Sequence, residues 1–332
     1  MKTISLSIIG FGAVGQGVAS SILTKQNYLK EQGFNLRVVA ISDSKGSEVN
    51  PEGIDIERAL KRKNQEGTIA KSNQKALDII REVEHEIVVE ATPTNIKDGE
   101  PGISNMLGAF NSGRHVVTSN KGPLVLRFLE LKEAAEDNGV MFRYEATVGG
   151  AVPIFNLIHE ALSGNTVIGI EGILNGTTNY ILTRMAEERM PYEIVMKEAQ
   201  ELGIAETDPS YDVEGIDSAC KLVIIANSIF GQNATYRDVN VTGITKITPE
   251  ALELASKNNY VVKLVCEAGK GHLTVAPRLV PKRHPLSVGG TLNVASILTD
   301  LAGRITISGK GAGSVETASS ILSDILYIIK NS

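Results

Sequence analysis

The chain has 332 residues, of which 42% are hydrophobic and 21% are charged, enough for two globular domains that each bury a core. A formal net charge of −5 without a long basic tract argues against nucleic acid or an anionic membrane surface as a partner. The first residues lack the apolar region of a signal peptide and no apolar run approaches the roughly 20 residues that span a bilayer, so we expect a cytoplasmic protein without a membrane segment.

The first 140 residues alternate strand-like and helix-like segments. Apolar runs typical of buried parallel strands occur at residues 4–10, 36–44, 86–94 and 114–122. Helical patterns follow them, as at residues 103–113 and 126–139. This alternation predicts an α/β fold with a Rossmann-type, doubly wound parallel sheet, and we place the first domain at residues 1–140.

The pattern changes after residue 140. A helix is predicted at residues 154–162, and a helix-rich stretch follows from 177 to 230, in which Pro191 is placed to begin a helix and Gly203 to end it. Strand-like segments return at residues 260–268, 272–280, 293–300 and 304–311, before a last helix at residues 315–329. Their short, turn-rich links predict an α+β second domain at residues 141–304 with a mixed or antiparallel sheet.

Three glycines, Gly10, Gly12 and Gly15, follow the first strand and open a helix. In a βαβ unit this G-x-G-x-x-G spacing indicates a dinucleotide site, because the glycines permit a tight turn, close approach of a pyrophosphate and close packing of the helix. The helix N–H groups then bind the phosphate charge. The alternative is a glycine-rich turn without a ligand. The residues expected to bind NAD or NADP here are Gly10, Phe11, Gly12, Ala13, Val14 and Gly15.

The choice between NAD and NADP stays open at this point. Asp43 ends the second strand and could accept hydrogen bonds from the ribose hydroxyls, which favours NAD. Its separation from Gly15 exceeds the usual spacing of roughly 20 residues, so the ribose contact could lie elsewhere. Lys45 and Arg62 could instead match the 2′-phosphate of NADP.

Thr92 and Lys121 each follow one of the predicted strands. Open α/β sheets bind ligands beyond the carboxyl ends of their parallel strands, so we expect both residues near the nicotinamide end of the cofactor. If the strand before it were not parallel, Lys121 would be a surface turn residue.

The predicted helix at residues 215–230 carries an ion pair on an otherwise apolar surface. Asp217 and Lys221 are four residues apart and therefore share one face. An exposed pair of this kind would contribute only about 0.2–0.5 kcal/mol. Because the helix is apolar nearly all round, we expect the pair to face a polar cavity instead.

The loop before this helix supplies further carboxylates, namely Glu206, Asp208, Asp212 and Glu214. They could bind a metal or the ammonium of an amino-acid substrate, or cap helices, which is the role we expect for Asp208 and Glu214. A dehydrogenase that oxidises an alcohol also needs a group that moves the hydroxyl proton, and a lysine can do this where a secluded polar site tunes its pKa. The five histidines are scattered through the sequence, so Lys221 is the better candidate and Lys121 its competitor.

Several blocks of the sequence resemble homoserine dehydrogenases, and together they cover nearly the whole chain. They read "GFGAVGQG", "SNKGPL", "YEATVGGAVP", "GILNGTTNYIL", "EAQELGIAETDPSYDVEGIDSACKL" and "GKGAG". The fourth and fifth blocks are far more specific than the glycine fingerprint. The resemblance implies reversible, NAD(P)-dependent interconversion of L-homoserine and L-aspartate 4-semialdehyde, in the synthesis of threonine, methionine and isoleucine.

The resemblance also implies roles for single residues. Lys221 matches the family's proton-transferring lysine, while Asp217 and Glu206 match carboxylates that hold the amino group of the substrate. Asp212 matches another acidic site residue, and Lys121 matches a lysine near the substrate and the nicotinamide. The glycines that the resemblance places beside the cofactor are Gly203, Gly311 and Gly313.

Further expectations concern ions and assembly. The segment "EATVGGAV" resembles the family's loop for sodium or another monovalent cation, with ligands from Glu145, Val148, Gly150 and Val152. The resemblance implies that residues 305–332 complete the dinucleotide-binding domain and that the second domain carries a homodimer contact. We expect a short form, without an aspartate kinase or a C-terminal regulatory domain.

Two other functions compete with this one. An aspartate-semialdehyde dehydrogenase needs an activated cysteine, but Cys220 is expected to face away from the Asp217–Lys221 pair and Cys266 lies within a strand. Buried thiols are therefore expected rather than a nucleophile, a disulfide or a metal site. A dinucleotide-sensing regulator would need a helix-turn-helix or a basic face, and the sequence has neither.

Overall fold

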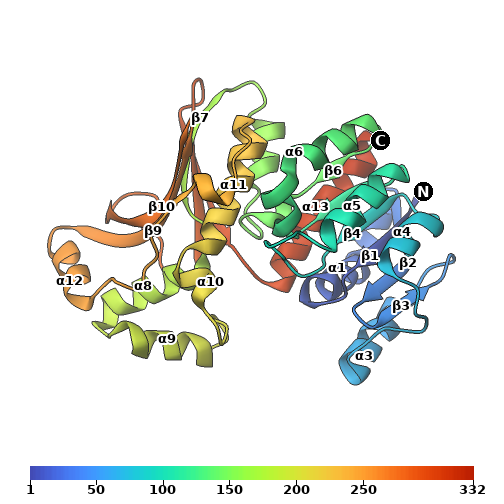
Figure 1. Ribbon diagram of the computed structural model, residues 1–332, viewed down its shortest axis with the longest axis horizontal. Helices are drawn as coiled ribbons and strands as arrows, with labels where there is room; N and C mark the ends of the chain where they lie inside the picture. Colours follow the sequence, from blue (N-terminus) through green and yellow to red (C-terminus); the bar gives the residue numbers. More distant parts are fainter. The chain divides into compact units, whose positions relative to one another are not determined.

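The computed structural model describes residues 1–332, which form two compact units. Unit 1 comprises Met1–Thr147 and Gly313–Ser332, and unit 2 comprises Val148–Ala312 (Figure 1). These limits lie a few residues beyond those predicted at 140 and 304. The reason is strand pairing: Phe142–Arg143 pairs within the sheet of unit 1, and Arg304–Lys310 pairs within the sheet of unit 2.

Unit 1 contains a six-stranded sheet in the order β3-β2-β1-β4-β5-β6. The strands are β1 (Lys2–Ile9), β2 (Phe34–Asp43), β3 (Gly46–Val49), β4 (Ile87–Glu90), β5 (His115–Thr118) and β6 (Phe142–Arg143). All neighbours are parallel except the edge strand β3, which turns back along β2. The strand order reverses between β1 and β4, and crevices at such reversals bind ligands in doubly wound folds. The predicted α/β fold is confirmed, whereas β3 was not predicted.

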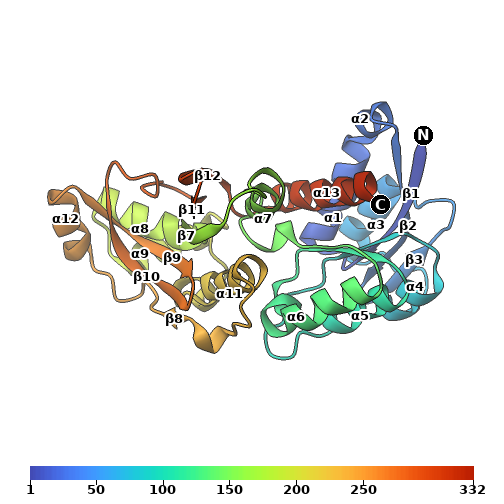
Figure 2. The same ribbon diagram turned by 90° about the horizontal axis from the view of Figure 1, so that it is seen from above.

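Helices cover both faces of this sheet (Figure 2). One set comprises α1 (Ala13–Thr24), α2 (Gln26–Glu31), α3 (Ile56–Glu66) and α13 (Ser314–Asn331). The other comprises α4 (Ala76–Glu82), α5 (Gly102–Asn111) and α6 (Lys121–Asp137). This arrangement leaves the carboxyl ends of β1, β4 and β5, together with the start of α6, at one edge of the sheet.

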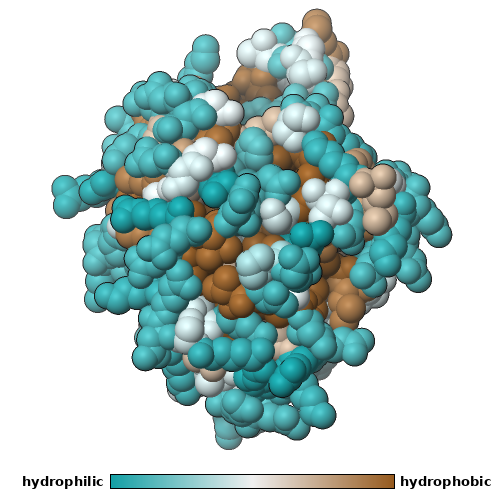
Figure 3. All heavy atoms as spheres, turned by 90° about the vertical axis from the view of Figure 1, so that its right-hand side faces the viewer, coloured by the Kyte–Doolittle hydropathy of each residue, from teal (hydrophilic) through white to brown (hydrophobic).

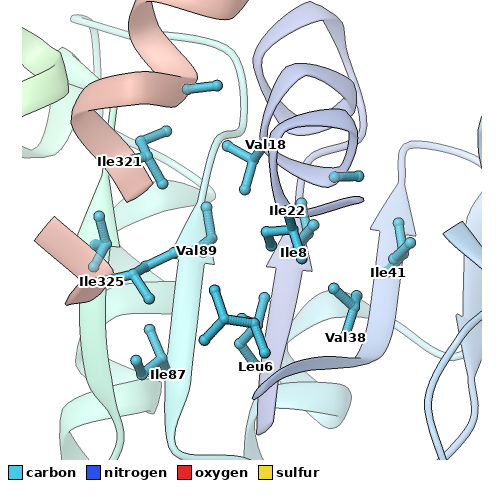
Figure 4. Close-up of a cluster of buried hydrophobic side chains, with 14 of the residues drawn as sticks. Leu6, Ile8, Val18, Ile22, Val38, Ile41, Ile87, Val89, Ile321 and Ile325 are labelled. Atoms are coloured by element: carbon cyan, nitrogen blue, oxygen red, sulfur yellow. The ribbon is translucent and has the colours of Figure 1, made fainter. Parts of the chain in front are cut away.

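The C-terminal helix α13 completes the core of unit 1. Its Ile321 and Ile325 are fully buried beside Val18 and Ile22 of α1, above the side chains of the central strands (Figure 4). Burial of each such side chain contributes about 1.5–3 kcal/mol. Removal of α13 would therefore uncover the centre of the first core, although the helix follows unit 2 in the sequence.

Unit 2 contains a six-stranded sheet that is mixed, one of the two types predicted, and has the order β12-β11-β7-β9-β10-β8. The strands are β7 (Val167–Ile173), β8 (Asn240–Val241), β9 (Tyr260–Gly269), β10 (His272–Pro281), β11 (Leu292–Thr299) and β12 (Arg304–Lys310). Only β8 and β10 are parallel. Its helices are α7 (Ile154–Asn156), α8 (Gly176–Glu188), α9 (Tyr192–Glu201), α10 (Ser210–Val213), α11 (Ile216–Phe230) and α12 (Pro249–Lys257).

One predicted helix differs in type from an ordinary α-helix. The helix predicted at residues 154–162 is α-helical only over α7 and continues as a π-helix at Leu157–Ala161. None of the helices combines the length and the apolar character needed to cross a bilayer. Hydrophilic side chains cover much of the face shown in Figure 3, with apolar residues visible between them, as is usual for folded proteins.

Candidate active site

The glycine loop between β1 and α1 has the shape that a dinucleotide requires. Gly10 has a φ of +95°, and a Cβ there would lie 2.4 Å from the carbonyl oxygen of Ala91, so only glycine fits. A Cβ at Gly15 would lie 2.1 Å from the oxygen of Gly10. A Cβ at Gly12 would meet nothing within 4 Å, and Gly12 begins α1 without a side-chain cap. The N-terminus of α1 is thus open and uncapped, which fits a pyrophosphate.

The side chains within this loop point away from that opening. The ring of Phe11 is 1% exposed and belongs to the core of unit 1, and Val14 packs against the same core. Ala13 is exposed as the first residue of α1. Contacts from this segment to a cofactor would therefore come mainly from the backbone.

Asp43 is engaged by its own unit, which weighs against the ribose role suggested by the sequence. Its Oδ1 accepts hydrogen bonds from Lys45 N (2.9 Å) and Thr68 Oγ1 (3.2 Å). Its Oδ2 accepts from Lys63 Nζ (2.7 Å) and Ile69 N (3.0 Å). A carboxylate has about four lone-pair sites, so little capacity remains for ribose hydroxyls.

The electrostatics of Asp43 agree with this structural role. Burial by itself would raise the pKa of the carboxyl, but the hydrogen bonds from Lys63, Lys45 and Ile69 outweigh it and hold the pKa below its usual range. Arg62 is likewise occupied, because its guanidinium lies 2.6 Å from Glu48 Oε2. Asp43 and Arg62 thus both have partners within unit 1.

The segments that carry Thr92 and Lys121 meet at one edge of the sheet. Strands β4 and β5 are parallel neighbours, and Asn120 Nδ2 donates to Thr92 Oγ1 over 3.1 Å. Asn120 also caps α6, since its Oδ1 accepts from Gly122 N. Lys121 is therefore the first residue of a helix held beside the end of β4, and not a surface turn residue.

A buried carboxyl, Glu90, lies beneath these two residues. It is fully buried at the end of β4, where Thr92 N and Thr118 Oγ1 donate to it over 3.2 and 3.3 Å, and the hydroxyl of Thr92 contacts it as well. Burial raises its pKa, because these neutral partners do not offset the desolvation of a charged carboxylate. Glu90 was not predicted as a site residue, because in the sequence it is one residue of an apolar strand.

The Asp217–Lys221 pair lies in unit 2 on α11, as predicted. Lys221 Nζ is 2.6 Å from Asp217 Oδ2 and donates a second hydrogen bond, also 2.6 Å, to the carbonyl oxygen of Leu174. Lys221 and Asp217 are only 8% and 5% exposed, and every residue of α11 from Asp217 to Asn227 is buried. The expected charged stripe on a buried helix is present.

Asn175 connects this pair to the acidic loop. Its Nδ2 donates to Asp217 Oδ2 over 3.0 Å and to Asp212 Oδ1 over 2.6 Å. Asp212 therefore joins the pair through Asn175, although it lies on the separate helix α10. Asn175 lies in a sequence block that resembles the family, but the sequence predicts no role for it, because nothing in the spacing relates residue 175 to residues 212 and 217.

The other loop carboxylates lie outside this network. Glu206 is exposed, and its carboxylate has no hydrogen bond or ion pair within the chain. Asp208 accepts a hydrogen bond from Ser210 N, which is the structural role expected for it. Glu214 is exposed at the end of α10. The predicted convergence therefore holds for Asp212, while no contact brings Glu206 to the pair.

Neither cysteine has the surroundings of a nucleophile. Cys266 is buried in β9, and burial raises its pKa to about 12. Cys220 is buried on α11, where the hydroxyl of Tyr211 lies 3.4 Å from its sulfur. Burial, Cys220 and the carboxylates of Asp217 and Asp212 all raise the pKa of Tyr211, so this hydroxyl stays protonated beside the acidic groups. The aspartate-semialdehyde dehydrogenase alternative gains no support.

The remaining predicted residues divide between the units. Glu145 is buried in unit 1, while Val148, Gly150 and Val152 are buried at the start of unit 2. The Val152 carbonyl accepts a hydrogen bond from Ile154 N, which leaves one lone pair for a cation. No group of three or more His, Cys, Asp or Glu side chains is arranged to hold a metal ion.

The three additional glycines have local structural roles. Gly203 belongs to unit 2 and has a φ of +69° just after the end of α9. Gly313 is the first residue of the returning segment of unit 1, directly before α13. A Cβ at Gly311 would lie 2.0 Å from Cγ of Asn293, so the close packing of unit 2 requires glycine there.

Comparison with known proteins gives a consistent result along the whole chain. The NAD binding domain of homoserine dehydrogenase matches residues 10–145, and the homoserine dehydrogenase domain matches residues 153–326. A homoserine dehydrogenase of Methanocaldococcus jannaschii is 51% identical over 326 residues, which cover 97% of each chain.

Solved structures agree with these matches. A putative homoserine dehydrogenase from Archaeoglobus fulgidus has a TM-score of 0.92 at 48% identity, with 98% of this chain and 99% of the other covered. A hyperthermophilic archaeal homoserine dehydrogenase in complex with NADPH has a TM-score of 0.87 at 29% identity, with 100% of this chain and 99% of the other covered.

Proposed function

The chain belongs to the homoserine dehydrogenase family, NAD(P)-dependent oxidoreductases that act on the alcohol group of homoserine, and we propose which of its residues perform this reaction. The observation that carries the proposal is the geometry of Lys221. An ammonium has three N–H donors. Two of those of Lys221 are directed to Asp217 Oδ2 and to the carbonyl oxygen of Leu174, which leaves the third for a substrate.

Lys221 moves the hydroxyl proton of homoserine. In the neutral amine, the two N–H groups keep their bonds to Asp217 and Leu174, so the lone pair points where the third donor was and can accept a proton. In the reverse direction the ammonium returns that proton to the carbonyl oxygen of the semialdehyde. A bound nicotinamide cofactor supplies the hydride chemistry.

The carboxylates around Lys221 hold the substrate ammonium. Asp217 and Asp212 provide a fixed negative surface, and Glu206 provides a carboxylate that no group of the chain occupies. Carboxylates attract an ammonium and accept its charge-assisted hydrogen bonds. Glu206 is thus the residue most free to move onto a substrate.

The glycine loop, Thr92 and Lys121 hold the cofactor. The open N-terminus of α1 at Gly12 suits the pyrophosphate, and Thr92 and Lys121 lie at the carboxyl ends of β4 and β5, where the nicotinamide end is expected. The proposal also gives Lys121 a contact to the substrate. The NADPH complex of one relative supports use of NADP, and the NAD binding domain match supports use of NAD.

Three further properties are part of the proposal. A sodium or other monovalent cation is held by Glu145 and by the carbonyl oxygens of Val148, Gly150 and Val152, which are hard ligands suited to such an ion. Thermal unfolding in sodium chloride, compared with choline chloride, tests this cation site, and equal unfolding midpoints in the two salts would refute it.

We also infer that the protein is cytoplasmic and forms a homodimer. Light scattering of the purified protein would reveal the dimer as twice the mass of the chain.

The reaction itself is tested by initial rates with homoserine and each cofactor. We expect homoserine-dependent formation of reduced nicotinamide with NAD, NADP or both, and semialdehyde-dependent oxidation in reverse. Absence of turnover with both cofactors, in protein that still binds them, would refute the assignment of substrate.

A further inference from the structure

We propose that Asn175 is a positioning residue of this active site: its side-chain amide fixes Asp217 and Asp212 relative to each other and thereby aims Lys221. The inference rests on the proposed function of Lys221 and extends it to a residue outside the expected catalytic and substrate-binding groups. It follows from the contacts of residues 174–175 with both Lys221 and Asp217.

Leu174 and Asn175 hold the two halves of the pair separately. The Leu174 carbonyl oxygen accepts from Lys221 Nζ, and the Asn175 amide donates to Asp217 Oδ2. The same Oδ2 accepts from Lys221, so the carboxylate oxygen is shared between the amine and the amide. Lys221, Asp217 and the chain at 174–175 thus form a closed set of hydrogen bonds, and a change at Asn175 alters the direction of Lys221.

Asn175 is itself held rigidly. It is 5% exposed and is the N-cap of α8, where its Oδ1 accepts from Thr178 N (2.9 Å) and Thr178 Oγ1 (3.0 Å). The side-chain oxygen of Asn175 therefore accepts hydrogen bonds from α8, and the two N–H groups of its amide donate to Asp212 and Asp217. Helix capping alone would be satisfied equally by aspartate or serine, so the cap does not explain why a donor stands here.

The donor has a separate electrostatic role. Asp212 and Asp217 are both carboxylates, and Lys221 is the cation paired with Asp217 in this network. A neutral amide that donates to both carboxylates reduces their repulsion and keeps Asp217 on Lys221. Asparagine is the residue of this shape that supplies an acceptor for the helix and donors for two carboxylates.

The test compares Asn175→Asp with the wild-type enzyme. Aspartate keeps the shape and the N-cap of α8 but removes the donors and adds a negative charge. We expect cofactor affinity to stay within about twofold and kcat for homoserine oxidation to fall at least tenfold, since misplacement of a proton-transfer group costs about 10² to 10⁴ in rate. We also expect the acidic limb of the kcat profile to move up by about one pH unit, because the added charge favours the protonated lysine.

Two further variants separate positioning from folding. Asn175→Ser keeps a capping oxygen without the donors, so it should lose kcat but show no upward shift of the acidic limb. Thr248→Ala removes the N-cap of α12 in the same unit, where Thr248 Oγ1 accepts from Ala251 N, and should lower stability by about 1 kcal/mol without changing kcat.

The possible outcomes are distinct. Wild-type kcat and an unshifted pH profile in Asn175→Asp would overturn the inference, as would a loss of kcat in Thr248→Ala equal to that in Asn175→Asp. If Asn175→Asp does not fold, the kcat of Asn175→Ser decides, and a wild-type value there also overturns it. Absence of homoserine oxidation in the wild-type enzyme would refute the proposed function instead.

Discussion

Lys221 and Asp217 form an ion pair of 2.6 Å, one helical turn apart, on a helix that is otherwise surrounded by the core of unit 2. Such a pair is an inefficient way to stabilise a helix. Removal of two charges from water costs several kcal/mol per ion, and apolar residues of similar volume are often equally stable or more stable. The pair therefore makes sense as part of a site, where the charge is needed for a reaction.

Replacement of the whole pair tests this view. Lys221→Met alone leaves Asp217 buried without its cation and should destabilise unit 2 by about 3–5 kcal/mol. The double variant Lys221→Met/Asp217→Leu should recover this loss and unfold at or above the wild-type temperature, yet have no measurable turnover. Lys197→Met, at an exposed lysine of the same unit, is the control and should leave both properties unchanged. Substantial turnover in the double variant would remove Lys221 and Asp217 from the mechanism.

Glu206 should affect substrate binding rather than proton transfer. Its carboxylate is exposed and has no partner in the chain, so Glu206→Gln should leave the melting temperature unchanged. Loss of a charge-assisted hydrogen bond of about 1.5–3 kcal/mol should raise KM for homoserine by one to two orders of magnitude. Steady-state kinetics with Glu201→Gln as an exposed control would measure this. An unchanged KM would show that the loop does not close on the substrate.

Glu90 should make the stability of unit 1 depend on pH in a specific direction. Its pKa is raised in the folded state, so its protonated form contributes stability that is full below the pKa of the unfolded chain and is lost as pH rises through the folded pKa. Glu90→Gln retains a neutral side chain at every pH. The melting temperature of the variant relative to the wild type should therefore rise as the pH is raised from acid to alkaline. A difference that is constant with pH would contradict a raised pKa of the buried Glu90.

Asp43 should behave in the opposite sense. The pKa of Asp43 is lowered in the folded state. Its contribution to the stability of unit 1 is therefore present above the ordinary pKa of an aspartate and is lost as the pH falls through the pKa of the folded state. Asp43→Asn should destabilise unit 1 by about 1–3 kcal/mol at neutral pH, and less in acid. The ratio of NAD to NADP activity should change little, because the carboxylate is already occupied. A large change in that ratio, absent in the exposed control Asp137→Asn, would restore a ribose contact to Asp43.

The glycine loop allows a matched pair of substitutions. Gly12→Val enters open space, so the chain should fold, while the added side chain blocks the approach of a pyrophosphate and cofactor affinity should fall at least tenfold. Gly10→Val meets the backbone of Ala91 in a left-handed conformation and should prevent stable folding. Fluorescence titration with reduced cofactor would measure the loss of binding in Gly12→Val, and a melting curve would measure the loss of folding in Gly10→Val. Normal cofactor binding by Gly12→Val would place the pyrophosphate elsewhere.

The architecture was predictable from the sequence because its determinants are local. The alternation of apolar strands and helices gave the parallel sheet of unit 1, and the nearly continuous apolar pattern of α11 located Asp217 and Lys221 on a buried helix. Strand parallelism was enough to bring Thr92 to Asn120, the residue before Lys121. Such features depend on periodicity and on the rule that carboxyl ends of parallel strands meet.

The remaining site features depend on contacts that sequence spacing does not encode. The partners of Asp43 are up to 26 residues away, and those of Asn175 are 37 and 42 residues away, so neither set could be inferred from local patterns. Glu90 was missed because a carboxyl in an apolar strand looks like any strand residue until its burial is known. The edge strand β3 was missed because its sequence, GSEV, has only one apolar side chain, unlike β4 and β5 of the same length.

The central claim is that Lys221 transfers the proton of homoserine oxidation, and single-turnover kinetics test it most directly. Wild-type enzyme and Lys221→Ala are each mixed with homoserine and saturating cofactor, and formation of reduced nicotinamide is followed, with cofactor affinity measured on the same samples. Because Asp217 loses its cation in the variant, the reaction is run at a temperature at which a melting curve shows unit 2 of the variant to be folded. We predict that the variant then binds cofactor like the wild type but forms product at least about 10²-fold more slowly. Product formation by Lys221→Ala at the wild-type rate would contradict the account.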